Sequence, residues 1–92
     1  MNFALTCIDK AGHSQVRADN RPAHLDYLKA NLDRLTIAGP LLADDGVTVQ
    51  GSLLVIEAAD RAAAEAFAAG DPYAKAGLFE SVTIKAFKKV LP

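Results

Sequence analysis

The sequence has one cysteine and no tryptophan among its 92 residues. A lone cysteine, Cys7, cannot form a disulfide within the chain, which excludes a disulfide framework and suits a reducing cytosol. No HExxH, CxxC or His-x-His spacing occurs, so a zinc site is not expected. The nucleotide-binding motifs GxGxxG and GxxxxGK are absent too. We therefore expect a cytoplasmic protein with no metal and no cofactor.

An excess of charge of one sign is also lacking. The 10 basic and 11 acidic side chains nearly cancel and form no long run, whereas a nucleic-acid surface needs clustered lysine and arginine. No apolar stretch is long enough to cross a membrane, and the opening MNFALTCIDK has no basic leader. We expect neither a nucleic-acid partner nor membrane association.

What the sequence does contain is apolar residues, which make up 51% of it. A chain of this length is expected to form one domain, residues 1–92, and to bury only about 60% of the surface that the unfolded chain exposes. Association with a second copy is a common way to cover the apolar surface that remains. A homodimer is therefore expected.

The spacing of apolar residues predicts four strands and two helices. The expected strands are 2–8, 36–42, 47–57 and 78–90, and the expected helices are 21–35 and the segment from Asp60 to Gly70. Residues 9–20 are expected to form a loop, and 43–46 and 71–77 are expected to form turns, the second with room for a single helical turn.

In the first helix, Asp19 or Asn20 is expected to act as the cap, with Pro22 in the first turn. Four leucines at spacings of three, four and three then share one face: Leu25, Leu28, Leu32 and Leu35.

The second helix is expected to begin at a cap, Asp60, and to stop at Gly70. Its predicted apolar stripe is Ala63, Ala66 and Phe67. Pro40 cannot donate to a strand ladder, so strand 36–42 should lie at a sheet edge or carry a bulge. In the last strand, one face should carry Val82, Ile84 and Ala86.

The order β-α-β-β-α-β predicts an α+β, ferredoxin-like fold: a four-stranded antiparallel sheet with both helices on one face. This topology places the start of the first helix and the end of the second at the same end of the sheet. His24, expected in the first turn of helix 21–35, should therefore lie within hydrogen-bonding reach of Asp71, which follows Gly70. The sheet face without helices predicts a homodimer whose sheets pack face to face about a two-fold axis.

Five segments, in order along the chain, resemble the YciI-like (YCII-related) family, and the match as a whole runs from residue 3 to residue 90. They are RPAHLDYL, AGPLL, Gly51-Ser52, GDPYAKAGLFE and IKAFKKV. The loop at 10–19 is the least distinctive part of the match. The resemblance implies a ferredoxin-like domain that dimerises through its sheets, as in the dimeric α/β barrel superfamily. It also implies a His-Asp active site at His24 and Asp71. A few relatives act on ring-hydroxylated or lactone-like compounds, so the family does not fix a substrate.

Each candidate residue also has a simpler interpretation. His24 could be a helix-start histidine that satisfies nearby carbonyls, and Asp71 could bond to its own Asp-Pro turn. The turn role and the active-site role of Asp71 can coexist, because one carboxylate oxygen can bond to the turn and the other to an imidazole. Arg21 at a helix start is electrostatically misplaced, which points to an anionic partner. Tyr73 is expected to line the pocket. Ser52 completes the predicted substrate-binding set, although packing alone would also explain it.

Two functions fit these residues. The first is a cofactor-independent enzyme in which His24 and Asp71 carry out acid–base chemistry on a small polar or hydroxylated cyclic organic molecule. Isomerisation, elimination and lyase- or hydrolase-like reactions all belong to this class. The alternative is a non-catalytic small-ligand-binding or regulatory dimer that uses the same pocket. A His-Asp pair favours the enzyme, because a fixed imidazole tautomer matters more for proton transfer than for binding.

Overall fold

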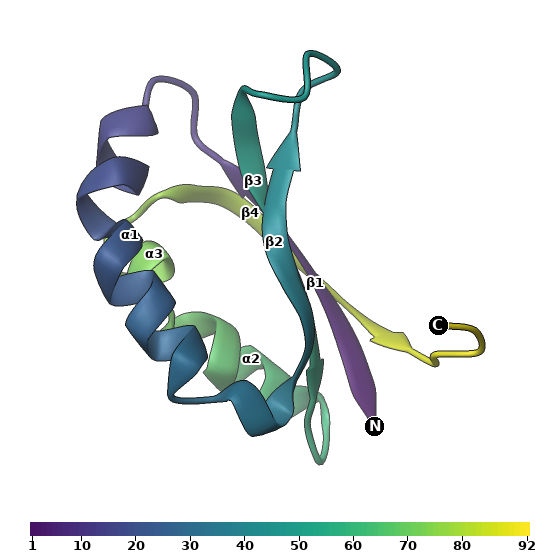
Figure 1. Ribbon diagram of the computed structural model, residues 1–92. Coiled ribbons are helices and arrows are strands. Elements are labelled where there is room, and N and C mark those ends of the chain that lie inside the picture. Colours follow the sequence, from purple (N-terminus) through teal and green to yellow (C-terminus); the bar gives the residue numbers. More distant parts are fainter.

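Eight segments of regular structure follow one another along residues 1–92 of the computed structural model (Figure 1). They are β1 (Asn2–Asp9), α1 (Ser14–Lys29), the 3₁₀ turn η1 (Leu32–Arg34), β2 (Leu35–Leu42), β3 (Val49–Glu57), α2 (Arg61–Gly70), α3 (Pro72–Lys75) and β4 (Phe79–Phe87). None of the helices combines the length and the apolar character that crossing a membrane would need.

The four strands form one antiparallel sheet in the order β2-β3-β1-β4. With the element order, this is the predicted ferredoxin-like βαββαβ arrangement. The three helices all lie on one face of the sheet (Figure 1). The single helical turn foreseen in 71–77 is α3, at Pro72–Lys75. The predicted fold class is confirmed.

The core lies between the helices and one face of β1. Alternate β1 side chains face the helices, and the strand register places Leu5 between Leu54 of β3 and Ile84 of β4. The buried cluster comprises Phe3, Leu5, Cys7, Leu28, Leu54, Ile56, Ala64, Phe67 and Ile84. The register also puts Val82, Ile84 and Ala86 on this face, as predicted, although only Ile84 is buried.

Helix α1 occupies Ser14–Lys29, so the predicted loop 9–20 is wrong from residue 14 onward. Neither Asp19 nor Asn20 caps the helix, and Pro22 lies inside it. The reason is chemical: one of the partly buried side chains in the first two turns is the charged Arg17, which is 13% exposed. The sequence therefore shows no apolar helical periodicity before Leu25, and the predicted helix start is seven residues too late.

The predicted leucine stripe is correct only in its first half. Leu28 is buried and Leu25 is half-buried in α1. The helix ends before Leu32, which lies in η1 and is 65% exposed, and Leu35 opens β2. A continuous helix over 21–35 is therefore wrong.

Helix α2 begins as expected, with the Asp60 side chain accepting a hydrogen bond from the Ala63 N–H at 2.8 Å. Its buried residues are Ala64 and Phe67, so Phe67 is buried as predicted, whereas Ala63 is only half-buried and Ala66 is exposed. The helix ends at Gly70, where a Cβ would come within 2.6 Å of the Tyr27 hydroxyl. Close packing of α1 on α2 accounts for this glycine.

Strand β2 is an edge strand, as Pro40 predicts, and its register with β3 shifts twice. Strand β3 is central but begins at Val49, two residues later than expected. Its Gly51 passes so close to β1 that a Cβ would stand 2.1 Å from the Cys7 carbonyl oxygen. Only glycine fits there, and the next residue, Ser52, enters the candidate site.

Candidate active site

His24 lies in the middle of α1 and is only 6% exposed. The prediction that it occupies the first turn is wrong, because the helix starts at Ser14. Its imidazole nevertheless meets Asp71, 47 positions later: Nδ1 lies 2.8 Å from Oδ1 and 3.1 Å from Oδ2. The contact expected from the topology is present, provided by a later turn of the helix.

Asp71 is buried between α2 and α3. Its Oδ1 accepts a hydrogen bond from the Tyr73 backbone N–H at 2.9 Å and so caps α3. One oxygen therefore serves both the turn and the imidazole, where the sequence suggested one oxygen for each. The backbone contact fixes the carboxylate, which in turn fixes the ring of His24.

The contact also assigns the tautomer of His24. An ionised carboxylate only accepts hydrogen bonds, so in the neutral imidazole Nδ1 carries the proton and Nε2 holds the lone pair. Nε2 has no partner in the chain, and no buried polar side-chain atom is left unpaired. Nε2 therefore opens into the cavity that His24 lines. A basic nitrogen in this position can take a proton from a bound molecule.

This cavity, called the histidine cavity below, has a volume of about 340 Å³. Its polar side chains are Arg17, Arg21, His24, Ser52 and Tyr73, and the rest of its lining is Leu25, Leu28, Ala38, Gly39, Pro40 and Val49. A mostly apolar wall with a few convergent polar groups is typical of small-molecule sites.

Tyr73 stacks on the imidazole of His24. The ring centroids are 4.0 Å apart and the planes differ by 16°. Tyr73 is 1% exposed, and its ring also meets Phe79 edge to face. The sequence placed Tyr73 at the pocket, and the structure brings it both to the pocket and against the histidine.

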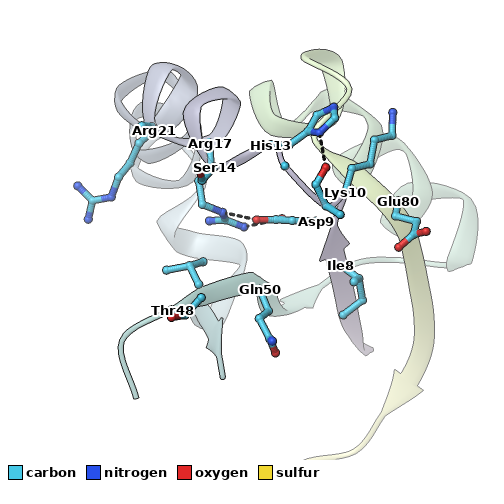
Figure 2. A pocket seen from close by; sticks show the side chains of 14 residues that line it. Ile8, Asp9, Lys10, His13, Ser14, Arg17, Arg21, Thr48, Gln50 and Glu80 are labelled. Atoms are coloured by element: carbon cyan, nitrogen blue, oxygen red, sulfur yellow. Dashed lines mark hydrogen bonds and ion pairs between the residues drawn. The ribbon is translucent and has the colours of Figure 1, made fainter. Parts of the chain in front are cut away.

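Arg17 and Asp9 are missing from the predicted site. The Arg17 Nε donates to Oδ2 of Asp9 at 2.7 Å and its Nη2 donates to Oδ1 at 2.9 Å, a bidentate pair drawn in Figure 2. Nη2 also donates to the Ser52 hydroxyl at 2.9 Å. The guanidinium carbon lies 4.5 Å from the centre of the Tyr73 ring. Arg17 is therefore the hydrogen-bond partner of the Ser52 hydroxyl in β3.

A signal for Arg17 was present in the sequence. Arg17 precedes His24 by seven residues, which is two helical turns, so the two side chains share a helix face. The signal is lost when residues 9–20 are read as a loop.

Arg21 is exposed and lies mid-helix, so the predicted electrostatic misplacement at a helix start is wrong. It makes no ion pair, and in Figure 2 its side chain extends away from the Arg17–Asp9 pair. It borders the histidine cavity and a larger neighbouring cavity of about 780 Å³. Arg21 is thus an unpaired cation at the junction of two cavities.

The larger cavity is formed by the end of β1, the loop that follows, the first turns of α1 and the start of β3 (Figure 2). Arg17, Arg21 and Val49 line both cavities. His13 lies in this loop, as expected, and its Nδ1 is 2.9 Å from the Ala11 carbonyl oxygen.

Burial and neighbouring charges set three pKa values at the site. Burial raises the pKa of the Tyr73 phenol above its ordinary value, although Arg17 opposes the shift. Burial lowers the pKa of Arg17, but the hydrogen bond and charge of Asp9 outweigh it, so the net pKa is raised. Burial and, to a smaller extent, the negative charge of Asp71 raise the pKa of the Cys7 thiol to about 12. Cys7 is thus a neutral core thiol rather than a nucleophile.

No three His, Cys, Asp or Glu side chains of the chain converge as a metal site would require.

The sequence matches the family model of the YCII-related domain over residues 1–88. Protein YciI of Escherichia coli O6:H1 is 39% identical, with 98% of this chain and 99% of that protein covered. Protein YciI of Shigella flexneri gives the same values.

Among solved structures, one similar protein is the 5-chloro-2-hydroxyhydroquinone dehydrochlorinase of Burkholderia phenoliruptrix AC1100, in complex with 2,5-dihydroxybenzoquinone. The TM-score is 0.87 at 35% identity, with 96% of this chain and 94% of that chain covered. A protein of Arabidopsis thaliana has a TM-score of 0.50 at 12% identity over 99% and 96% of the two chains, which reflects the fold alone.

Proposed function

The chain belongs to the family of YCII-related domains, and from this premise we propose that it is a cofactor-independent enzyme that carries out acid–base chemistry on a small hydroxylated cyclic molecule. One observation carries the proposal: Asp71 holds Nδ1 of His24, while Nε2 opens into the histidine cavity. A pure packing role for His24 would give Nε2 a partner in the protein.

His24 acts as the proton carrier and Asp71 as its orienting partner. Nε2 takes a proton from a ring hydroxyl or an acidified C–H, and the resulting imidazolium is stabilised by the Asp71 carboxylate 2.8 Å away. The same nitrogen then returns the proton to another atom. Moving it from one ring position to another is an isomerisation; in an elimination, a leaving group departs afterwards with its bonding electrons.

The choice of a hydroxylated ring is supported by the similar dehydrochlorinase, whose substrate is 5-chloro-2-hydroxyhydroquinone and whose complex holds 2,5-dihydroxybenzoquinone. A cavity of about 340 Å³ has room for a single substituted ring. Arg21 is proposed to attract the negative charge of such a molecule, and Tyr73 to form one wall beside His24. Ser52 contributes through Arg17, to which its hydroxyl is bonded.

The test is a screen of hydroxyhydroquinones, their chlorinated forms, dihydroxybenzoquinones and lactones by thermal shift, followed by absorbance assays of every hit. Consumption of at least one hit by the wild-type protein, without added metal or cofactor, is the expected result. A ligand that binds but is never consumed would instead support the non-catalytic binding dimer.

We further propose that residues 1–92 act as one domain and form a homodimer through the helix-free face of the sheet. Support comes from the apolar side chains on that face, among which Ile37 is 54% exposed and Phe87 is 44% exposed. Burying such side chains against a second copy would remove them from water. Sedimentation at micromolar concentration should give a dimer; a species of 9.7 kDa would contradict this proposal.

The cytoplasm is the proposed location, because a single buried cysteine suits a reducing compartment. Fractionation of cells that express the protein should recover it with cytoplasmic markers, whereas recovery with secreted or membrane markers would refute the assignment.

A further inference from the structure

Among the ion pairs of this chain that do not involve histidine, only that of Asp9 and Arg17 has both side chains largely buried, at 12% and 13% exposure. The pairs Arg61–Glu65 and Met1–Glu57 are both more than half exposed. Burying two charges costs hydration that their attraction barely repays, so such a pair is weak evidence for stability. The free-energy cost of burying the Asp9–Arg17 pair indicates that the pair has a role other than stability.

The contacts of Arg17 lead to the candidate catalytic residue. Its guanidinium lies 4.5 Å from the Tyr73 ring centre, and that ring lies 4.0 Å from the imidazole centroid of His24. Two helical turns separate Arg17 from His24, about 10.5 Å along α1, which leaves room for one aromatic ring between them. Tyr73, in contact with both, occupies that space.

Each partner restrains a different motion of the imidazole. Asp71 holds Nδ1 and so fixes the ring in its own plane. The stacked Tyr73 ring opposes rotation of the His24 imidazole out of its plane, and the guanidinium of Arg17 in turn contacts the Tyr73 ring. Arg17 in turn is held by three hydrogen bonds, two to Asp9 and one to Ser52.

We propose that Arg17, locked by Asp9 and Ser52, is a positioning residue: it presses Tyr73 against His24 and so aims Nε2 into the histidine cavity. This inference rests on the proposed function of His24 for its meaning, but its geometry can be tested without a substrate. The planar guanidinium provides a fixed fork and a flat face for the ring, and a lysine provides neither.

The substrate-free test is NMR of the two histidine rings in the full chain. The variant Asp9→Asn/Arg17→Met removes both charges at once, so neither is left buried without a partner. Ring protons stacked on Tyr73 resonate upfield, so the double variant should shift the His24 signals downfield toward those of a free imidazole, with His13 unchanged. The single variant Arg17→Lys should give an intermediate shift.

Arg21→Met is the matched control, because Arg21 is exposed on the same helix and makes no ion pair. It should leave the His24 signals in place. If the double variant is folded by circular dichroism and its His24 signals coincide with the wild type, the proposal is wrong. If the double variant does not fold, Arg17→Lys decides: unchanged His24 signals would overturn the proposal and a downfield shift would support it.

With 5-chloro-2-hydroxyhydroquinone or any other hit of the screen, the double variant should lower kcat about 10–100-fold and change KM little, because misaimed reacting groups cost rate more than binding. Equal kcat in the wild type and the folded double variant would overturn the proposal. If no compound is consumed by the wild type, the proposed function fails and the NMR shifts still decide the role of Arg17.

Discussion

Replacing Gly51 by alanine should destabilise the sheet next to the candidate site. The added Cβ would stand 2.1 Å from the Cys7 carbonyl oxygen, 3.1 Å from its carbonyl carbon and 3.3 Å from the Ile8 Cα. All three are backbone atoms of β1, so no side chain can turn away and the two central strands must separate. Overpacking of this kind costs about 1–3 kcal/mol.

In a domain of this size, about 1 kcal/mol corresponds to roughly 4–8 °C in Tm. Thermal unfolding of Gly51→Ala followed by circular dichroism should therefore show a fall of roughly 4–24 °C. Gly39→Ala in β2 is the matched control, because nothing lies within 4 Å of its added Cβ, and its Tm should stay close to the wild type. Equal Tm values for the two variants would refute the close approach of β3 to β1.

Further outcomes follow from single contacts. Asp71→Asn replaces a charge-assisted hydrogen bond to His24 by a neutral one, a loss of about 1–2 kcal/mol, so kcat should fall roughly 5–30-fold. The control is Asp26→Asn, because Asp26 is exposed on α1. Equal kcat values for the two variants would count against the role of the His24–Asp71 pair. Because the pKa of Cys7 is raised to about 12, the folded protein should resist iodoacetamide at pH 8 and react once unfolded in urea; rapid native labelling would contradict the burial. The same raised pKa makes the unfolding free energy fall as pH rises from about 9 towards 12, and Cys7→Ala should reduce that fall. Asp60→Ala removes the α2 cap and should cost about 1 kcal/mol in urea titrations, whereas no change would show that the cap is dispensable.

The fold could be predicted from the sequence because its strands obey simple rules. β1 alternates buried and half-buried residues, Pro40 marks an edge strand, and Asp60 and Gly70 bound α2. Each of these features is local. The element order then leaves one simple compact topology, which the register of the sheet confirms.

The start of α1 could not be predicted because its buried positions have been given to polar groups. Arg17 and His24 occupy the helix face that leucines would occupy in an ordinary amphipathic helix. The sequence therefore shows no apolar periodicity that would predict a helix there. A helix predicted to begin at residue 21 leaves Arg17 in a loop and therefore outside the predicted site.

His24 and Asp71 were brought together correctly because the prediction depended on which end of the sheet each occupies, and the Asp-Pro turn after α2 is read easily. The stacking of Tyr73 on His24 and the link from Arg17 to Ser52 join residues up to 49 positions apart. Such side-chain contacts depend on the packing of α1 over the sheet, which no short segment of sequence encodes.

The most direct test of the central claim is turnover by His24→Asn, measured as initial rates on a compound that the wild-type protein consumes, with 5-chloro-2-hydroxyhydroquinone tried first. Asparagine can keep a hydrogen bond to Asp71 but cannot carry a proton, so the variant should keep its Tm within a few degrees, still bind the compound and retain less than about 1% of the wild-type rate. A folded His24→Asn variant that turns the compound over at the wild-type rate would contradict the account.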